Sequence, residues 1–309
     1  MSSSPKTTTT SVIRYHHLAV VCSDLNRSRE FYHKVGFFEK NNGEEALSCM
    51  ILANEGGLEL HLFQSSRSNA PIQNNILIDF PDEKFPGHTH MSFGVGSVPG
   101  VKAYFKEQNI PLSGTREIPG KGLVAVFVRD PDGTVLEFER NDGGDDGAVV
   151  TSKGLSNAPR GGIDHIGTRV SNPEVSLQWY VRAFGFRESV MKNELDEDPK
   201  KNFRPWIIRT QRGEDDIDIN LIVNAPTSGE NVLLSSKDDP LPGILYAAYV
   251  VESIESTLKS IDPGDVARTE SDLKAWGISS KYCISSGSLK SCFCFVRDLD
   301  KTIYRLVEL

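Results

Sequence analysis

The stretch YHHLAVVCSDLNRSREFYHKVGFFE, residues 15–39, returns in outline as IDHIGTRVSNPEVSLQWYVRAFGFRE at residues 163–188. A second pair of similar stretches comes later in each copy, FVRDPDGTVLEF at 127–138 and FVRDLDKTIYRL at 295–306. Two halves that begin and end alike indicate an internal duplication. The segment between them is rich in Gly, Asp and Ser, as linkers commonly are. The expected parts are a disordered arm at 1–11, a first domain at 12–141, a linker at 142–161 and a second domain at 162–309.

The composition is that of an ordinary globular protein, with 38% apolar and 25% charged residues. The formal net charge of −8 disfavours contact with phosphate backbones and anionic lipid, so we expect neither a nucleic-acid nor a membrane partner. No run approaches the roughly 20 apolar residues that cross a bilayer. The five cysteines lack the spacing of a zinc site. We interpret them as reduced residues of a cytoplasmic protein.

Within the first half, the pattern predicts two rounds of strand, helix and further strands. Asp24 is placed to cap the first helix, and Gly36 is placed to end it. The second helix is expected within VPGVKAYFKEQN, residues 98–109. Alternating or continuous apolar runs give the strands. The expected strands are 17–21, 47–53, 58–63, 88–95, 124–130 and 134–140.

Alternation along these strands separates apolar side chains from potential metal ligands. Glu59 and His61 share the face of LELHL that lies opposite the leucines. His88 and His90 share one face of HTHMSF, and Glu137 lies on the polar face of VLEFER. A sheet with one face in water gives the same pattern. The alternation alone therefore fits a metal site and a hydrogen-bonded surface equally well.

The nested duplication resembles the vicinal-oxygen-chelate family, which includes glyoxalase I, methylmalonyl-CoA epimerase, extradiol dioxygenases and fosfomycin-resistance proteins. The residues that carry the resemblance are His17 in HHLAVVCSDLNRSREFY, Glu59 in GLELHLF, His90 in GHTHMSFGV and Glu137 in DPDGTVLEF. The resemblance implies an α+β fold of two tandem glyoxalase-like domains, each a pair of βαβββ modules that form a cupped mixed sheet. It also implies a divalent metal ion. Two imidazoles with one or two carboxylates suit Fe(II), Mn, Ni, Co or Zn.

The two halves are unequal in potential ligands. Six of the seven histidines precede residue 100. Where the first half has His90, the second has Ala247 or Ala248, and where the first has Glu137, the second has Arg305. An arginine at a ligand position repels a cation, so we expect no metal site built from the second half alone. Arg305 is instead a candidate partner for an anionic group of a substrate.

The metal ligands expected from the first half alone are His17, Glu59, His90 and Glu137. The two carboxylates of this set, Glu59 and Glu137, are the candidate catalytic groups for proton transfer. Some family members, glyoxalase I among them, complete each site with strands from two domains. An exchanged set therefore stays open, in which His165 and Asp218 join His90 and Glu137.

The resemblance implies a metal-dependent, glyoxalase-like lyase or isomerase that acts on a small oxygenated substrate through a metal-stabilised enediolate. Two alternatives stay open, an extradiol-type dioxygenase with Fe(II) and a non-catalytic module that sequesters a small molecule. A fourth ligand, Glu59, favours proton transfer. The sequence HLFQ stands where glyoxalase I often has Asn-Trp-Gly, so glutathione use is not implied. We expect a monomer, with a homodimer as the alternative. The candidate substrate contacts are His61, His88, Lys121 and Arg305.

Overall fold

The computed structural model describes most of the chain in eleven segments. None of the described helices is both long enough and apolar enough to span a lipid bilayer. The arm expected at 1–11 lies outside the described residues. The described residues are 12–40, 49–65, 85–140, 149–151, 154–156, 163–189, 204–209, 218–223, 241–261, 281–286 and 289–309.

The described chain contains four modules, each with a strand, a helix and three further strands, which confirms the predicted α+β class. The first consists of β1 (Val12–Cys22), α1 (Leu25–Lys34), β2 (Phe38–Glu39), β3 (Cys49–Ala53) and β4 (Glu59–Gln64). The second consists of β5 (Gly87–Val95), α2 (Val98–Glu107), β6 (Leu112–Ile118), β7 (Gly122–Arg129) and β8 (Val135–Arg140). The third consists of β11 (His165–Arg169), α3 (Pro173–Phe184), β12 (Arg187–Ser189), β13 (Arg204–Arg209) and β14 (Asp218–Val223). The fourth consists of β15 (Gly243–Val251), α4 (Ile254–Leu258), β16 (Lys281–Ser286), β17 (Leu289–Arg297) and β18 (Ile303–Glu308).

Local sequence sets the ends of the first helix. Asp24 is the N-cap, and its carboxylate accepts hydrogen bonds from the backbone amides of Asn26 and Arg27. After the helix, Gly36 turns the chain with a φ of 95°. A side chain there would overlap the carbonyl oxygen of Leu155, so the glycine also permits a close approach between two segments.

Leu155 belongs to a short hairpin inside the segment predicted as a linker. Its strands are β9 (Val149–Thr151) and β10 (Gly154–Ser156), which pair antiparallel. The side chain of Leu155 is buried in the same core as the first two modules. The predicted linker is therefore partly ordered, and it packs against the half that precedes it.

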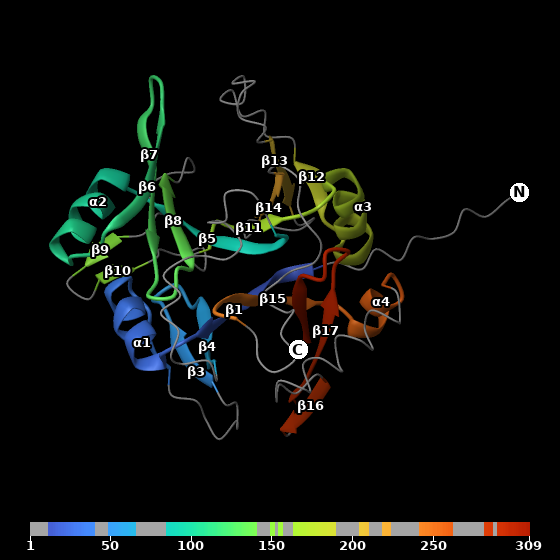
Figure 1. The fold of residues 1–309 in the computed structure, drawn as a ribbon. Helices are drawn as coiled ribbons and strands as arrows, with labels where there is room; N and C mark the ends of the chain where they lie inside the picture. The colour runs from blue at the N-terminus through green and yellow to red at the C-terminus, as the bar shows by residue number, and fades with distance from the viewer. Residues whose placement is uncertain are drawn as a thin grey trace, which may run out of the picture.

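The strands form two eight-stranded sheets, and each sheet runs across both halves of the chain (Figure 1). The first sheet has the order β16-β17-β18-β15-β1-β4-β3-β2, and the second has the order β12-β13-β14-β11-β5-β8-β7-β6. Both are mixed, because β1 is parallel to β4 and antiparallel to β15, while β5 is parallel to β8 and antiparallel to β11.

This topology corrects one expectation. We expected the two modules of one half to share a sheet, whereas the structure pairs the first module with the fourth and the second with the third. Each module presents its first strand as an open edge, and an open edge must find a partner. The edge of β1 is covered by β15, and the edge of β5 is covered by β11.

A shared core holds the two modules of each half together on the helical side. In the first half, the rings of Phe37 and Phe93 have centroids 5.9 Å apart, and Phe93 stacks on Phe138 at 5.3 Å. The halves predicted from the repeat are therefore packing units, although neither half closes a sheet of its own.

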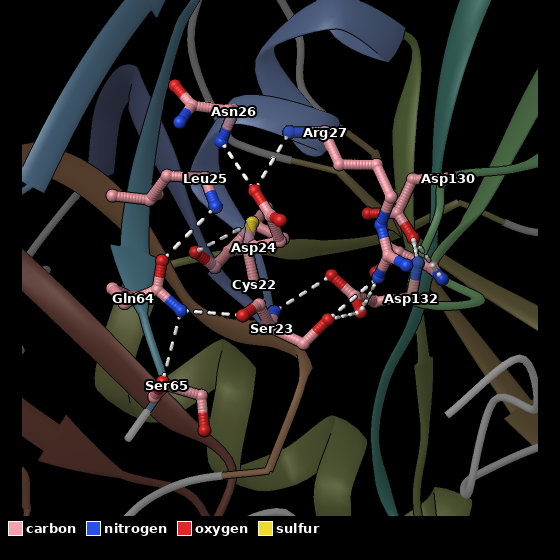
Figure 2. A network of polar contacts seen from close by, with 12 residues as sticks. Cys22, Ser23, Asp24, Leu25, Asn26, Arg27, Gln64, Ser65, Asp130 and Asp132 are labelled. Carbon is pink, nitrogen blue, oxygen red and sulfur yellow. Dashed lines mark hydrogen bonds and ion pairs between the residues drawn. The ribbon is translucent and has the colours of Figure 1, made fainter. Parts of the chain in front are cut away.

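The repeated turn FVRDxD adds polar contacts between the modules of each half, and Figure 2 shows those of Asp132 in the first half. Asp132 accepts hydrogen bonds from the backbone amide of Ser23 at 2.9 Å and from Nη2 of Arg27 at 3.1 Å. Tyr32 donates to Asp130 at 3.0 Å. The second half repeats the scheme, since Asp300 accepts from Ser171, and Tyr180 donates to Asp298. The duplicated sequence thus encodes a duplicated contact.

The cysteines only partly match the expectation of reduced thiols. Cys22, Cys49 and Cys294 are not part of a disulfide, whereas Cys292 is disulfide-bonded. The pairing of β16 with β17 sets Cys283 directly opposite Cys292. The expectation is therefore wrong for Cys292.

Candidate metal centre

The pairing of modules across the halves divides the four predicted ligands between the two sheets. His17 on β1 and Glu59 on β4 lie in the first sheet. His90 on β5 and Glu137 on β8 lie in the second, where β11 brings His165 beside them. The four residues of the predicted first-half site are therefore not brought together. His165 of the exchanged set joins His90 and Glu137 instead, and the side chain of Asp218 lies outside the described residues.

Three potential ligand atoms converge in the second sheet. His90 Nε2 lies 3.1 Å from His165 Nε2 and 3.3 Å from Glu137 Oε2. His165 Nε2 lies 3.5 Å from Glu137 Oε2. Ligand atoms that surround one ion at about 2.0–2.2 Å are about 2.8–3.6 Å from one another in octahedral or tetrahedral sites. The spacing in this His90–Glu137–His165 cluster therefore fits a shared cation.

Two carboxylates fix the orientation of His165. Its Nδ1 lies 2.9 Å from Oδ2 of Asp164 and 3.0 Å from Oε1 of Glu139. A carboxylate only accepts hydrogen bonds, so Nδ1 carries the proton. A neutral His165 then presents the lone pair of Nε2 to the cluster, which is how a metal-binding imidazole is normally oriented.

A hydroxyl fixes the orientation of His90 in the same sense. Thr89 Oγ1 donates to the carbonyl oxygen of Gly167 at 3.1 Å, and a lone pair of the same oxygen accepts from His90 Nδ1, also at 3.1 Å. The lone pair of His90 Nε2 therefore faces the cluster as well. Gly167 makes room for the ring, because a methyl group on its Cα would lie 2.7 Å from His90 Nε2 and nearer still to Cε1 and Nδ1.

Glu137 turns one oxygen to the imidazoles and keeps the other buried without a hydrogen bond. The unpartnered atom is Oε1. Nη2 of Arg116 lies 3.1 Å from it, outside hydrogen-bond geometry, and donates to Glu139 at 2.5 Å. A buried carboxylate oxygen that accepts no hydrogen bond is costly, and a bound ligand would satisfy it.

The charges of the cluster favour a cation. Burial lowers the pKa of His90, so its imidazole is neutral at neutral pH. Burial also lowers the pKa of His165, but hydrogen bonds to Asp164, Glu137 and Glu139 outweigh burial and raise it well above its ordinary value. Burial raises the pKa of Glu137, but hydrogen bonds from His165 and His90 outweigh burial, so the pKa of this carboxyl lies below its ordinary value. Positive charge is thus stabilised at this position.

The first sheet places its polar residues in a different environment. His17 is stacked on His61 with ring centroids 3.7 Å apart, and its Nε2 lies 3.5 Å from Nη1 of Arg305. Glu59 is held by Lys40 and by Nε2 of His61 at 3.2 Å. Two cationic side chains occupy this site, so Glu59 and His17 are not assembled as metal ligands.

The strand register also corrects the residue that replaces His90. His165 is opposite Ser92 on β5, and His17 is opposite Ala248 on β15. His90 precedes Ser92 by two residues, and Tyr246 precedes Ala248 by two. The counterpart of His90 is therefore Tyr246, rather than Ala247 or Ala248.

The remaining predicted residues have varied positions. His88 is buried, with Nδ1 2.9 Å from Thr168 Oγ1 and Nε2 3.4 Å from the carbonyl oxygen of Ile303, so neither nitrogen is left for a substrate. Lys121 is exposed in the turn between β6 and β7, and its substrate contact stays a prediction. Asp218 is the strand partner of His165, and its side chain lies outside the described part of the chain.

Several residues of the site had no assigned role in the sequence-based prediction. Asp164 and Thr89 each directly precede the imidazole that they orient. That adjacency was visible in the sequence. Arg116 was not detectable in this way, because β6 reaches Glu137 only through the pairing of β6, β7 and β8.

Comparisons with known proteins agree with the duplication. The family model described as "Glyoxalase/Bleomycin resistance protein/Dioxygenase superfamily" matches residues 14–138 and again residues 162–274. The "Uncharacterized protein YwkD" of Bacillus subtilis is 30% identical over 134 residues, which are 40% of this chain and 93% of that protein.

Two solved structures share the fold over nearly the whole chain. Glyoxalase I from Zea mays has a TM-score of 0.55 and 13% identity, over 96% of this chain and 92% of that one. A putative dioxygenase from Bacillus subtilis has a TM-score of 0.54 and 11% identity, over 96% of this chain and 86% of that one. Since the family model matches two segments that together cover most of the sequence, the chain belongs to the glyoxalase, bleomycin-resistance and dioxygenase superfamily.

Proposed function

We propose that the chain is a metal-dependent enzyme of this superfamily and that its metal site is the His90–Glu137–His165 cluster. The observation that carries the proposal is the convergence of three ligand atoms within 3.5 Å, with both imidazoles oriented by partners at Nδ1. Two imidazoles and one carboxylate leave half of an octahedron open. A divalent ion there would supply Lewis acidity toward two neighbouring oxygens of a small substrate.

The ligand set suits Fe(II), Mn, Ni, Co or Zn, as the sequence suggested. Asp218 is our candidate for a fourth ligand, because its backbone is paired with that of His165. Glu59 is no longer a candidate, since it belongs to the other sheet.

The favoured reaction is a glyoxalase-like isomerisation or lyase step in which Glu137 moves a proton. Its Oε1 is buried and accepts no hydrogen bond, so it is available to accept a proton from a substrate carbon. Arg116 lies beside this oxygen, and its guanidinium lowers the basicity of the carboxylate. With 44% of its side chain exposed, Arg116 has room to move aside when a substrate enters.

An extradiol-type dioxygenase is the second candidate. Two histidines and one carboxylate with open positions are typical of non-haem Fe(II) oxygenases. The preference for proton transfer rested partly on a fourth ligand, Glu59, which the structure places elsewhere.

Metal analysis tests the site. Protein purified without added metal should hold about one divalent ion per chain. H165A and E137Q should lose the ion, and H17A should keep it, because His17 lies in the other sheet. Loss of the ion in H17A with retention in H165A would contradict the proposed ligand set. Absence of any ion, with unchanged ligand binding in H165A, would instead favour the sequestering module.

A paired assay then separates the two reactions. Protein loaded with Ni, Co or Zn is assayed with methylglyoxal and a panel of thiols, and protein loaded anaerobically with Fe(II) is assayed with catechols for oxygen uptake. Turnover without oxygen uptake supports proton transfer. Oxygen uptake that depends on His165 supports the dioxygenase.

The substrate we propose is a small molecule, and the oligomeric state we propose is a monomer. Both eight-stranded sheets are completed by strands of a single chain, so no second copy is needed to build the metal site. Sedimentation velocity tests this directly, because a stable dimer would contradict it. The cytoplasmic location stays a prediction.

A further inference from the structure

The first sheet contains a second group of converging polar side chains at the position that corresponds to the metal cluster. The strand register makes His17 the counterpart of His165, Tyr246 the counterpart of His90, and Arg305 the counterpart of Glu137. One imidazole is therefore kept, the other becomes a phenol, and the carboxylate becomes a guanidinium. Two ligands for a cation have been replaced by two hydrogen-bond donors.

These counterparts lie as close together as the metal ligands do. His17 Nε2 is 3.4 Å from the hydroxyl of Tyr246 and 3.5 Å from Nη1 of Arg305. Burial raises the pKa of Tyr246, so the phenol keeps its proton and remains a donor at neutral pH. Burial also lowers the pKa of His17, so this imidazole stays neutral. The guanidinium is therefore the cation at the centre of the group.

The guanidinium of Arg305 has an unsatisfied donor. Its Nε is buried and has no hydrogen-bond partner. No carboxylate among the described residues lies within ion-pair distance of it, and the nearby Glu59 is engaged by Lys40 and His61. A buried hydrogen-bond donor normally has a partner, and leaving such a donor unpaired costs free energy. The side chain is thus ready for an anion.

Aromatic rings surround this cation. The guanidinium carbon of Arg305 lies 3.9 Å from the centre of the Phe293 ring and 5.9 Å from that of Phe295, in cation–π geometry. Phe63 lies next to Tyr246, with ring centroids 6.4 Å apart. These rings pack in one apolar cluster on this face of the first sheet, separate from the main core. An occupant would therefore need an apolar body as well as an anionic group.

We propose that His17, Tyr246 and Arg305 form a metal-independent binding site for a small organic carboxylate with a planar apolar body. A guanidinium binds a carboxylate with two parallel hydrogen bonds, and the phenol of Tyr246 supplies a further donor. The single positive charge matches a monoanion better than it matches a phosphate dianion. The aromatic side chains suit an aryl or unsaturated body.

Calorimetric titration of the full chain tests the proposal, with benzoate as the probe and with benzyl alcohol and inorganic phosphate as comparisons. Benzoate should bind once per chain, and benzyl alcohol, which lacks the carboxylate, should bind at least about tenfold more weakly. R305M should weaken benzoate binding about 30-fold or more. R305K keeps the charge but loses the planar fork, so about a tenfold loss is expected.

The matched control is E137Q, which changes the equivalent position of the other sheet. It should leave benzoate binding unchanged, and R305M should leave metal content unchanged. Titration after removal of metal by a chelator excludes binding through the ion. Failure of the metal proposal would therefore leave this result intact.

Three results would overturn the proposal. The first is that benzoate does not bind to the wild-type chain. The second is that benzoate binding survives R305M but is lost in E137Q. The third is that phosphate binds more tightly than benzoate and its binding depends on Arg305. Thermal unfolding of R305M and R305K shows whether each variant is folded, and R305K serves as the test if R305M is not.

Discussion

Substitution of Gly167 by alanine tests how the second sheet positions a metal ligand. Gly167 lies on β11 opposite His90, and its Cα faces the imidazole. The change adds one methyl group and no charge. It removes and alters no ligand atom, so any effect on metal binding must come from displacement of the His90 ring.

The displacement can be worked out from the geometry. The added methyl would lie 1.9 Å from His90 Cε1, whereas ordinary contact begins near 3.4 Å, so the rigid ring must retreat by about 1.5 Å and carry Nε2 with it. Ligand distances in metal sites tolerate only about ±0.2 Å. His90 should therefore cease to be a ligand. Loss of an orienting partner alone typically costs 10–100-fold in affinity, so we expect a loss of about 100-fold or more.

The assay is competition for a divalent ion against a chromophoric chelator. G96A is the matched control, because nothing lies within 4 Å of a methyl group at Gly96. It should bind metal like the wild-type chain. Overpacking at Gly167 should also lower the free energy of unfolding by about 1–3 kcal/mol, which chemical denaturation measures.

A double variant separates displacement of the ring from general damage. H90A should lose as much affinity as G167A, and G167A/H90A should lose no more than H90A alone, because the clash disappears with the ring. Wild-type affinity in G167A would refute the reasoning. So would a further large loss in the double variant.

Three other predictions concern stability. G36A should lower the free energy of unfolding by about 2–4 kcal/mol, because Gly36 has a positive φ and the carbonyl of Leu155 lies against it. G57A should lower it by only about 1–2 kcal/mol, since nothing lies within 4 Å of a methyl group at Gly57. Equal losses in thermal unfolding would contradict this. D132A should lower the free energy of unfolding by about 1–3 kcal/mol in urea, because the amide of Ser23 loses its acceptor, and an unchanged midpoint would refute that role. Burial raises the pKa of Asp298 from 3.8 to about 7, so between these values the folded chain retains a proton that the unfolded chain has released. The free energy of unfolding should therefore fall as pH rises from about 4 to 7. D298N should flatten this pH dependence in melting curves, and an identical slope would count against it.

The elements of the fold were predictable because their signals are local. Helix α1 begins after the capping residue Asp24 and is followed by Gly36, as its sequence indicated. The strands that carry His90 and Glu137 were predicted from alternation and are present. Capping, turn chemistry and side-chain period act over a few residues, so one sequence contains them.

Which residues share a site was less predictable, because it depends on which strand edges pair with one another. The first strand of each module has a similar pattern, and nothing local tells β1 to pair with β15 rather than with β5. His165 was recognised as a candidate only through an alternative arrangement. Tyr246 was missed, because aligning His90 with an alanine shifted the register; the glycines that open the two strands, Gly87 and Gly243, give the correct alignment.

The partition of the sheets has an evolutionary consequence. Each sheet draws one module from each half, so a change in the first or fourth module alters one sheet and leaves the residues of the other in place. A duplicated chain built in this way can keep one site while the equivalent site changes. Arg305 stands where the other sheet has the carboxylate of Glu137.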